Sequence, residues 1–272
     1  MKFLNFLDSE MVKPLPYGWF HLMCFAIVIA LSVLVIVFRK KFNTKSINII
    51  LLVTGIVMIV FEIYKQVIMN FDNGAFEPYH WYIFPFQFCS TPMYLMVTAG
   101  LIGLISKKNG NVYSCIVSYL ATFALFAGVA VMFLPTTVFI ETIGINIQTM
   151  VVHGGMVVIG VLLLATQTTK VEWKTLLKAV IVFTIMVVAA LVMNIVWRFV
   201  GPYQEHTFNM FFISPWYNCE LPLLQIVQDA TPYVVFLLTY IIGFTACASI
   251  VLAAAIGIKK LHQIITNKKK SS

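Results

Sequence analysis

Charged side chains are scarce in this chain. Asp, Glu, Lys and Arg make up only 10% of its 272 residues, whereas 61% are hydrophobic. A soluble domain carries about 25% charged residues, and no polar stretch here is long enough for a second domain. The composition therefore argues against a soluble protein and predicts one all-α transmembrane domain over residues 1–272, because helices with apolar surfaces satisfy their own backbone in lipid.

Cysteine pairs and internal repeats are also lacking. The five cysteines are an odd number and form no Cys-x-x-Cys motif, which argues against a disulfide framework. The absence of a repeat counts against the usual transporter folds. The net charge is +8, but Lys and Arg cluster at the ends of apolar runs, a pattern typical of membrane proteins. We therefore expect no nucleic-acid partner.

Seven apolar runs are long enough to cross a bilayer, which takes roughly 20 helical residues. Most end at charges, prolines or glycines. The predicted spans are residues 17–38, 47–69, 81–106, 112–134, 147–166, 175–200 and 231–258. The sequence thus predicts a seven-transmembrane-helix bundle in the cell membrane, followed by a basic tail at 259–272.

The distribution of Lys and Arg predicts the orientation. Fourteen of the 18 lie on the side that holds the tail, three lie on the other side, and Lys65 lies within the second span. Cytoplasmic loops carry the excess of such residues, so we predict the N-terminus outside and the C-terminus inside. The longest predicted outer loop, 201–230, is rich in aromatic residues and prolines, which is typical of a segment lying on or dipping into the interface.

Five polar side chains lie inside the predicted spans at similar depth, in the outer half. They are His21, Glu62, Cys89, His153 and Asn194. Such residues are costly in lipid, usually face a bundle interior or cavity, and carry function. They predict an outward-facing polar pocket. Glu62 needs a partner, a proton or water at this depth, and Lys65, three residues on, lies on the same helix face.

Among the sequence segments around these five residues, the segment around Cys89 contains the most polar side chains. Pro85 and Pro92 flank the cysteine within one predicted helix, which should kink because Pro92 frees a backbone carbonyl near Phe88. Gln87, with neighbouring hydroxyls, is placed to satisfy that backbone. Two glycines follow His153 in the fifth span, and they allow close approach of a helix or a ligand.

These residues resemble a known family. The chain is similar to the YwaF-type integral membrane proteins of Gram-positive bacteria, which are related to a eukaryotic family of seven-span phospholipid acyltransferases. The matching features are Phe20-His21-Leu22, Glu62, Pro85-Phe86-Gln87-Phe88-Cys89, His153, Asn194 and the stretch from Asn209 to Pro215. The resemblance implies a bacterial plasma-membrane protein in which Cys89 is the nucleophile and His153 its base in acyl transfer between membrane lipids.

The residues themselves leave three functions open. In an acyltransferase or lipid hydrolase, Glu62 or Asn194 would orient His153, and Gln87 or Asn194 would stabilise an oxyanion. The substrate would be a membrane phospholipid or another acyl lipid, and no cofactor would be needed. At the outer surface, Arg198 could contact lipid phosphate.

The other two functions need different chemistry. In a transporter or small-ligand-binding protein, Glu62, His21 and His153 would bind a polar ligand or relay protons. In a zinc hydrolase, these three and Cys89 would be metal ligands. No two of them have close ligand spacing, so we expect no metal site.

Overall fold

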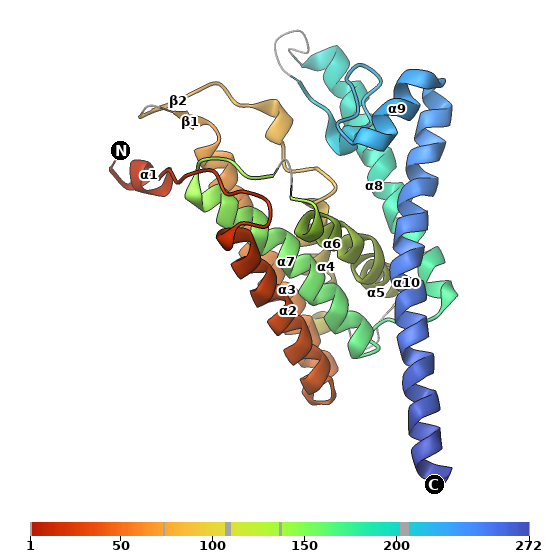
Figure 1. Ribbon diagram of the computed structural model, residues 1–272. Coiled ribbons are helices and arrows are strands. Elements are labelled where there is room, and N and C mark those ends of the chain that lie inside the picture. Colours follow the sequence, from red (N-terminus) through yellow and green to blue (C-terminus); the bar gives the residue numbers. More distant parts are fainter. Residues whose placement is uncertain (1, 73, 107–109, 136–137, 202–206, 272) are drawn as a thin grey trace.

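Apolar helices build almost the whole molecule. The computed structural model describes residues 2–72, 74–106, 110–135, 138–201 and 207–271 (Figure 1). The α-helices are α1 (Lys2–Leu7), α2 (Trp19–Phe38), α3 (Thr44–Ile68), α4 (Thr91–Ile105), α5 (Asn111–Tyr119), α6 (Leu125–Phe133), α7 (Ile143–Ala165), α8 (Trp173–Val200), α9 (Pro222–Ala230) and α10 (Tyr233–Ser271). A π-helical segment, Leu120–Ala124, joins α5 to α6, and β1 (Phe71–Asp72) pairs antiparallel with β2 (Ala75–Phe76).

Among the described residues, six helices are long and apolar enough to cross a membrane. They are Trp19–Lys41, Thr44–Ile68, Asn111–Phe133, Ile143–Ala165, Trp173–Val200 and Tyr233–Asn267. Each overlaps one of the predicted spans, so the prediction of an all-α, multi-pass membrane protein is confirmed at this level. The predicted basic tail continues as helix in α10, which extends well past the other helices (Figure 1).

The prediction of one continuous helix over 81–106 is wrong. A 3-10 turn at Trp81–Ile83 is followed by irregular backbone, and helix α4 begins only at Thr91. Pro92 lies in the first turn of α4, where its missing N–H is not needed for a helical hydrogen bond. The proline therefore starts a helix instead of kinking one, and Cys89 precedes α4.

The middle of the bundle is formed by α5, the π-helical segment, α6 and α7. In the most apolar 18-residue stretch of the span 111–133, 72% of the residues are buried, and in that of the span 143–165 the share is 61%. The corresponding share is only 11% in the span of α2 and in that of α10. Helices α3 and α4 pack through glycines: a Cβ atom at Gly100 would lie 2.7 Å from the backbone nitrogen of Leu52. Small residues let helices approach closely in this way.

The predicted outer loop folds inward. Phe208, Met210, Phe211 and Ile213 are buried, and Phe211 and its neighbour Phe212 have positive φ values of 59° and 57°. Such backbone is costly for aromatic residues and persists only where the surroundings fix it. Residues 202–206 of this loop, the Lys107–Lys108 charge cluster and Ser272 of the basic tail lie outside the described residues.

Candidate active site

Glu62 is paired on its own helix. Its carboxylate Oε1 lies 2.7 Å from Lys65 Nζ, and the same oxygen accepts a hydrogen bond of 2.7 Å from Gln66 Nε2. The i,i+3 partner expected from the sequence is therefore confirmed. Glu62 is only 4% exposed, so this pairing compensates a carboxylate that would otherwise be costly to bury.

A short hydrogen-bonded chain connects this pair to the segment before α4. Gln66 Nε2 also donates to the Ile83 carbonyl at 2.8 Å, and Tyr79 donates its phenolic proton to Gln66 Oε1. Burial first, and then the charge of Glu62 and the neighbouring Tyr94, raise the pKa of Tyr79 to about 12. Tyr79 therefore stays protonated and acts as a donor at ordinary pH.

Lys65 connects Glu62 to the two predicted catalytic residues. Besides its ion pair with Glu62, its positive charge acts at longer range on the Cys89 thiol and on the His153 ring. Of these three residues, Glu62 is in direct contact with Lys65, whereas within the described part of the chain neither Cys89 nor His153 forms a hydrogen bond or an ion pair with it.

The ring of His153 has a defined tautomer. Its Nδ1 lies 2.8 Å from the carbonyl oxygen of Thr149, and because a carbonyl only accepts, Nδ1 carries the proton. The lone pair is then on Nε2, which has no hydrogen-bond partner in the described part of the chain. A neutral histidine held through Nδ1 with a free Nε2 has the form that a general base requires.

Gln87 and Asn194 bind the backbone of the inward-folded loop. Gln87 accepts from the Phe211 N–H at 2.9 Å and donates to the Asn209 carbonyl at 3.0 Å. Asn194 accepts from the Met210 N–H at 2.8 Å and donates to the carbonyl of the same residue at 3.0 Å. Both amides therefore use their donor and acceptor atoms to hold the loop, a contact the sequence did not indicate.

Asn209 closes the loop on itself. Its Oδ1 accepts from the Ser214 N–H at 2.9 Å, and its Nδ2 donates to the Asn218 carbonyl at 3.0 Å. Nearby, the guanidinium of Arg198 lies over the ring of Trp216, 5.7 Å from its centroid. These contacts cap the bundle above α8 and do not involve Cys89.

His21 lies in a different neighbourhood. Its Nδ1 accepts from the Tyr17 N–H at 3.0 Å, so Nε2 carries the proton and donates to the Met132 carbonyl at 2.9 Å. Its ring packs against Phe25 and Phe139. With both nitrogens satisfied, His21 ties α2 to the end of α6. In the described ranges, no group of three or more His, Cys, Asp and Glu side chains is arranged to hold a metal ion.

The chain matches one known protein family over most of its length. The sequence profile described as the TMEM164 family matches residues 16–255, which is most of the chain. The chain belongs to the TMEM164 family. No curated protein and no solved structure matches it. Membership of this transmembrane family, together with the six apolar helices, makes it an integral, multi-pass membrane protein, while the acyl-transfer chemistry implied by the YwaF-type resemblance remains a prediction.

Two residues near Cys89 in this TMEM164-family chain had not been expected there. Tyr119 is fully buried at the end of α5, directly before the π-helical segment, and its hydroxyl lies 3.5 Å from Oγ1 of Thr91, which is two residues after Cys89. Lys65 was expected to pair with Glu62, but its charge was not expected to act on Cys89 and His153. A π-helical segment is often found at functional sites, but its position could not be predicted from a sequence pattern.

Proposed function

We propose that this TMEM164-family protein is a lipid acyltransferase or lipid hydrolase in which Cys89 is the nucleophile and His153 is the base. The observation that carries the proposal is the His153 ring, whose Nδ1 is held by the Thr149 carbonyl and whose Nε2 has no hydrogen-bond partner in the described part of the chain. A thiol and a neutral imidazole with a free Nε2 are the components of a cysteine-dependent acyl transfer. The positive charge of Lys65 would stabilise the thiolate that forms during the reaction.

The proposed reaction has two halves. In the first, the Cys89 proton passes to Nε2 of His153, the thiolate attacks the ester carbonyl of a phospholipid, and the ester C–O bond breaks. The departing alkoxide takes the proton back from His153 and leaves a thioester on Cys89. In the second, His153 removes a proton from the hydroxyl of an acceptor lipid, or from water in a hydrolase. That oxygen attacks the thioester, and the sulfur recovers its proton.

The substrate class follows from the surroundings. Cys89 precedes helix α4, and the ring of its neighbour Phe88 packs in an aromatic cluster with Phe183, Phe211 and Phe244. Such walls suit an acyl chain better than a hydrophilic substrate. Helix α4 would be the seventh crossing together with the irregular segment before it. The position of the two termini at opposite ends of the bundle supports an odd number of crossings (Figure 1).

The test is an acyl-transfer assay with purified protein in phosphatidylcholine vesicles. One acyl chain of the phospholipid is labelled, and lysophospholipid is the acceptor. We expect Cys89→Ala to lower the initial rate of label transfer or release at least about 100-fold, and His153→Gln to lower it by roughly the same factor. The control is Cys115→Ala, since Cys115 is half-buried on α5 and has no role in the proposed chemistry.

Trapping the intermediate gives a second readout. Labelled acyl chain should remain on the denatured wild-type protein, be released by hydroxylamine as a thioester, and be missing from Cys89→Ala. Equal transfer rates for Cys89→Ala and Cys115→Ala would overturn the thiol mechanism.

A further inference from the structure

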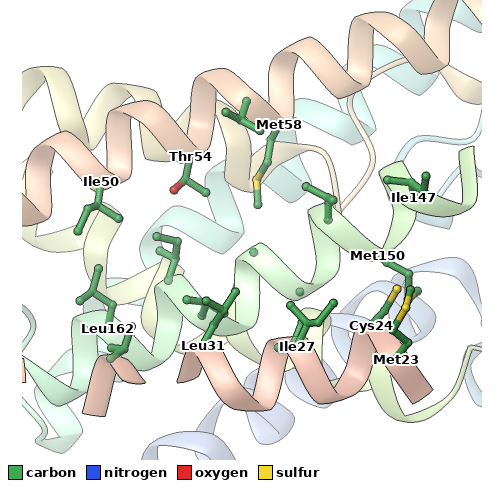
Figure 2. Close-up of a pocket in the computed structure, with 18 of the residues that line it drawn as sticks. Met23, Cys24, Ile27, Leu31, Ile50, Thr54, Met58, Ile147, Met150 and Leu162 are labelled. Atoms are coloured by element: carbon green, nitrogen blue, oxygen red, sulfur yellow. The ribbon is translucent and has the colours of Figure 1, made fainter. Parts of the chain in front are cut away.

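A long apolar groove runs along the outside of the bundle, away from Cys89. Helices α2 and α3 form its walls and α7 forms its floor (Figure 2). Its volume is about 530 Å³, and Thr54 is its one hydroxyl-bearing lining residue. None of the predicted active-site residues lines it, so the groove is separate from the site of the proposed chemistry.

Glycines and the splay of the walls keep the groove open. Helix α2 packs mainly on α7, and α3 packs mainly on α4, so the two walls diverge after the turn that joins them. On the floor, Gly154 and Gly155 present no side chain. A Cβ atom at Gly154 would lie 2.5 Å from Val28 Cγ2, and one at Gly155 would lie 2.4 Å from Met58 Cε.

The groove has the length and direction of a lipid chain. It extends along α2 from Phe20 to Val35, fifteen residues that correspond to about 22 Å of helix. One leaflet of the hydrocarbon core is about 15 Å thick, half of roughly 30 Å. An acyl chain lying parallel to the helices therefore fits within the groove.

The two ends of the groove differ in charge. At one end, the lining residue Phe42 directly follows the 3-10 turn Arg39–Lys41, and Lys45 lies in the first turn of α3. Lys40, Lys41 and Lys45 are exposed, and the sequence contains no Asp or Glu between Phe20 and Phe61. At the other end, near Phe20 and Ile147, the lining is apolar.

An apolar channel that opens beside four cations matches one class of molecule. A phospholipid places its phosphate next to its acyl chains, and a net negative headgroup is attracted to nearby Lys and Arg side chains. We propose that this groove binds an acyl chain of an anionic phospholipid, with the headgroup held by the basic turn Arg39–Lys41. The lipid is a bound component of the fold, and its binding does not depend on the proposed acyl transfer.

Native mass spectrometry tests the groove. The purified protein is mixed in detergent with equal amounts of phosphatidylglycerol and phosphatidylcholine, and the retained lipid is counted. We expect Val57→Trp, which fills the groove from α3, to lower retained phosphatidylglycerol at least fivefold. The matched control is Val53→Trp, one turn away on the same helix, exposed and outside the lining. It should retain as much lipid as the wild type.

A second pair of variants approaches from the opposite wall. Leu31→Trp fills the groove from α2, and Leu34→Trp is its control, because Leu34 is similarly exposed but does not line the groove. This pair decides the question if Val57→Trp fails to fold. Equal lipid retention by the filled variant and its control, in a pair that elutes as folded protein, would overturn the proposal.

The charge component has its own test. Replacing Lys40 and Lys41 together by Gln should lower the preference for phosphatidylglycerol over phosphatidylcholine roughly tenfold. The matched control replaces the adjacent pair Lys259 and Lys260, on α10, by Gln and should leave the preference unchanged.

Glycerol phosphate, which has the headgroup chemistry without acyl chains, should not compete. Competition by glycerol phosphate, or equal binding of the two lipids by the wild type, contradicts an acyl-chain site for an anionic lipid. Cys89→Ala should bind lipid normally, which separates this result from the fate of the acyl-transfer proposal.

Discussion

At the scale of single residues, Lys65 organises the polar interior. Its ammonium neutralises Glu62 at 2.7 Å and acts on both Cys89 and His153. The Lys65 side chain is 18% exposed, so its charge is largely removed from solvent and its compensation comes from Glu62. Removing one partner of such a pair leaves an uncompensated charge, so Lys65 and Glu62 depend on each other.

Tyr79 reports on this pair through its own ionisation. We expect its phenol to lose its proton at a pH of about 12, measured as phenolate absorbance in the wild type minus that of Tyr79→Phe. Because the folded-state pKa is raised above the ordinary 10.0, the contribution of Tyr79 to stability is fully present below pH 10 and is lost as the pH rises towards 12.

The Glu62→Gln variant separates the causes of this shift. Burial is the largest cause and the Glu62 charge is a smaller one, so the pKa of Tyr79 in Glu62→Gln should fall but stay above 10.0. A Tyr79 that ionises at the ordinary value in the wild type would contradict its burial beside the charge of Glu62.

At the scale of helices, prolines and glycines decide which segments are regular and how closely they pack. Pro92 could either kink a long helix or begin a short one, because its missing N–H is tolerated in both places. The structure has the second outcome, since Gln87 binds the inward-folded loop and the backbone before Thr91 is irregular. The choice depended on a loop more than 120 positions away, which local sequence does not encode.

Gly100 tests the contact between α3 and α4. A Cβ atom there would meet the backbone at Leu52 and Asn48 within 2.7–2.9 Å, and backbone cannot rotate away. We expect Gly100→Ala to destabilise the protein by about 1–3 kcal/mol, seen as a lower midpoint of thermal unfolding in detergent. Gly243→Ala in α10 is the matched control, because no atom lies within 4 Å of its added Cβ. Alanine is the better helix former, so that variant should be neutral or more stable by up to about 1 kcal/mol. The same loss of stability in both variants would mean that helix contact is not the reason for glycine at position 100.

At the scale of the whole molecule, the termini lie at opposite ends of the bundle (Figure 1), and the predicted seven spans would put most Lys and Arg residues on the side of the C-terminus. We expect an epitope tag at the N-terminus to be removed by protease added to intact spheroplasts, while a tag at the C-terminus is protected until lysis. Immunoblotting of both tags measures this. Tags that are cleaved together would mean an even number of crossings and would contradict both the predicted orientation and the crossing of α4.

The sequence by itself determined that this is an all-α, multi-pass membrane protein and where six long helices run. The length of each apolar run and the placement of Lys and Arg are local properties of the chain, and each run is long enough to cross the bilayer or not, independently of the others. Only the tertiary structure decided which polar residues meet. Depth along a helix does not specify its rotation or its neighbours. The five residues at similar depth therefore have separate surroundings: Glu62 is paired with Lys65, Cys89 precedes α4, His153 is held by the Thr149 carbonyl, Asn194 binds the inward-folded loop, and His21 lies between α2 and α6.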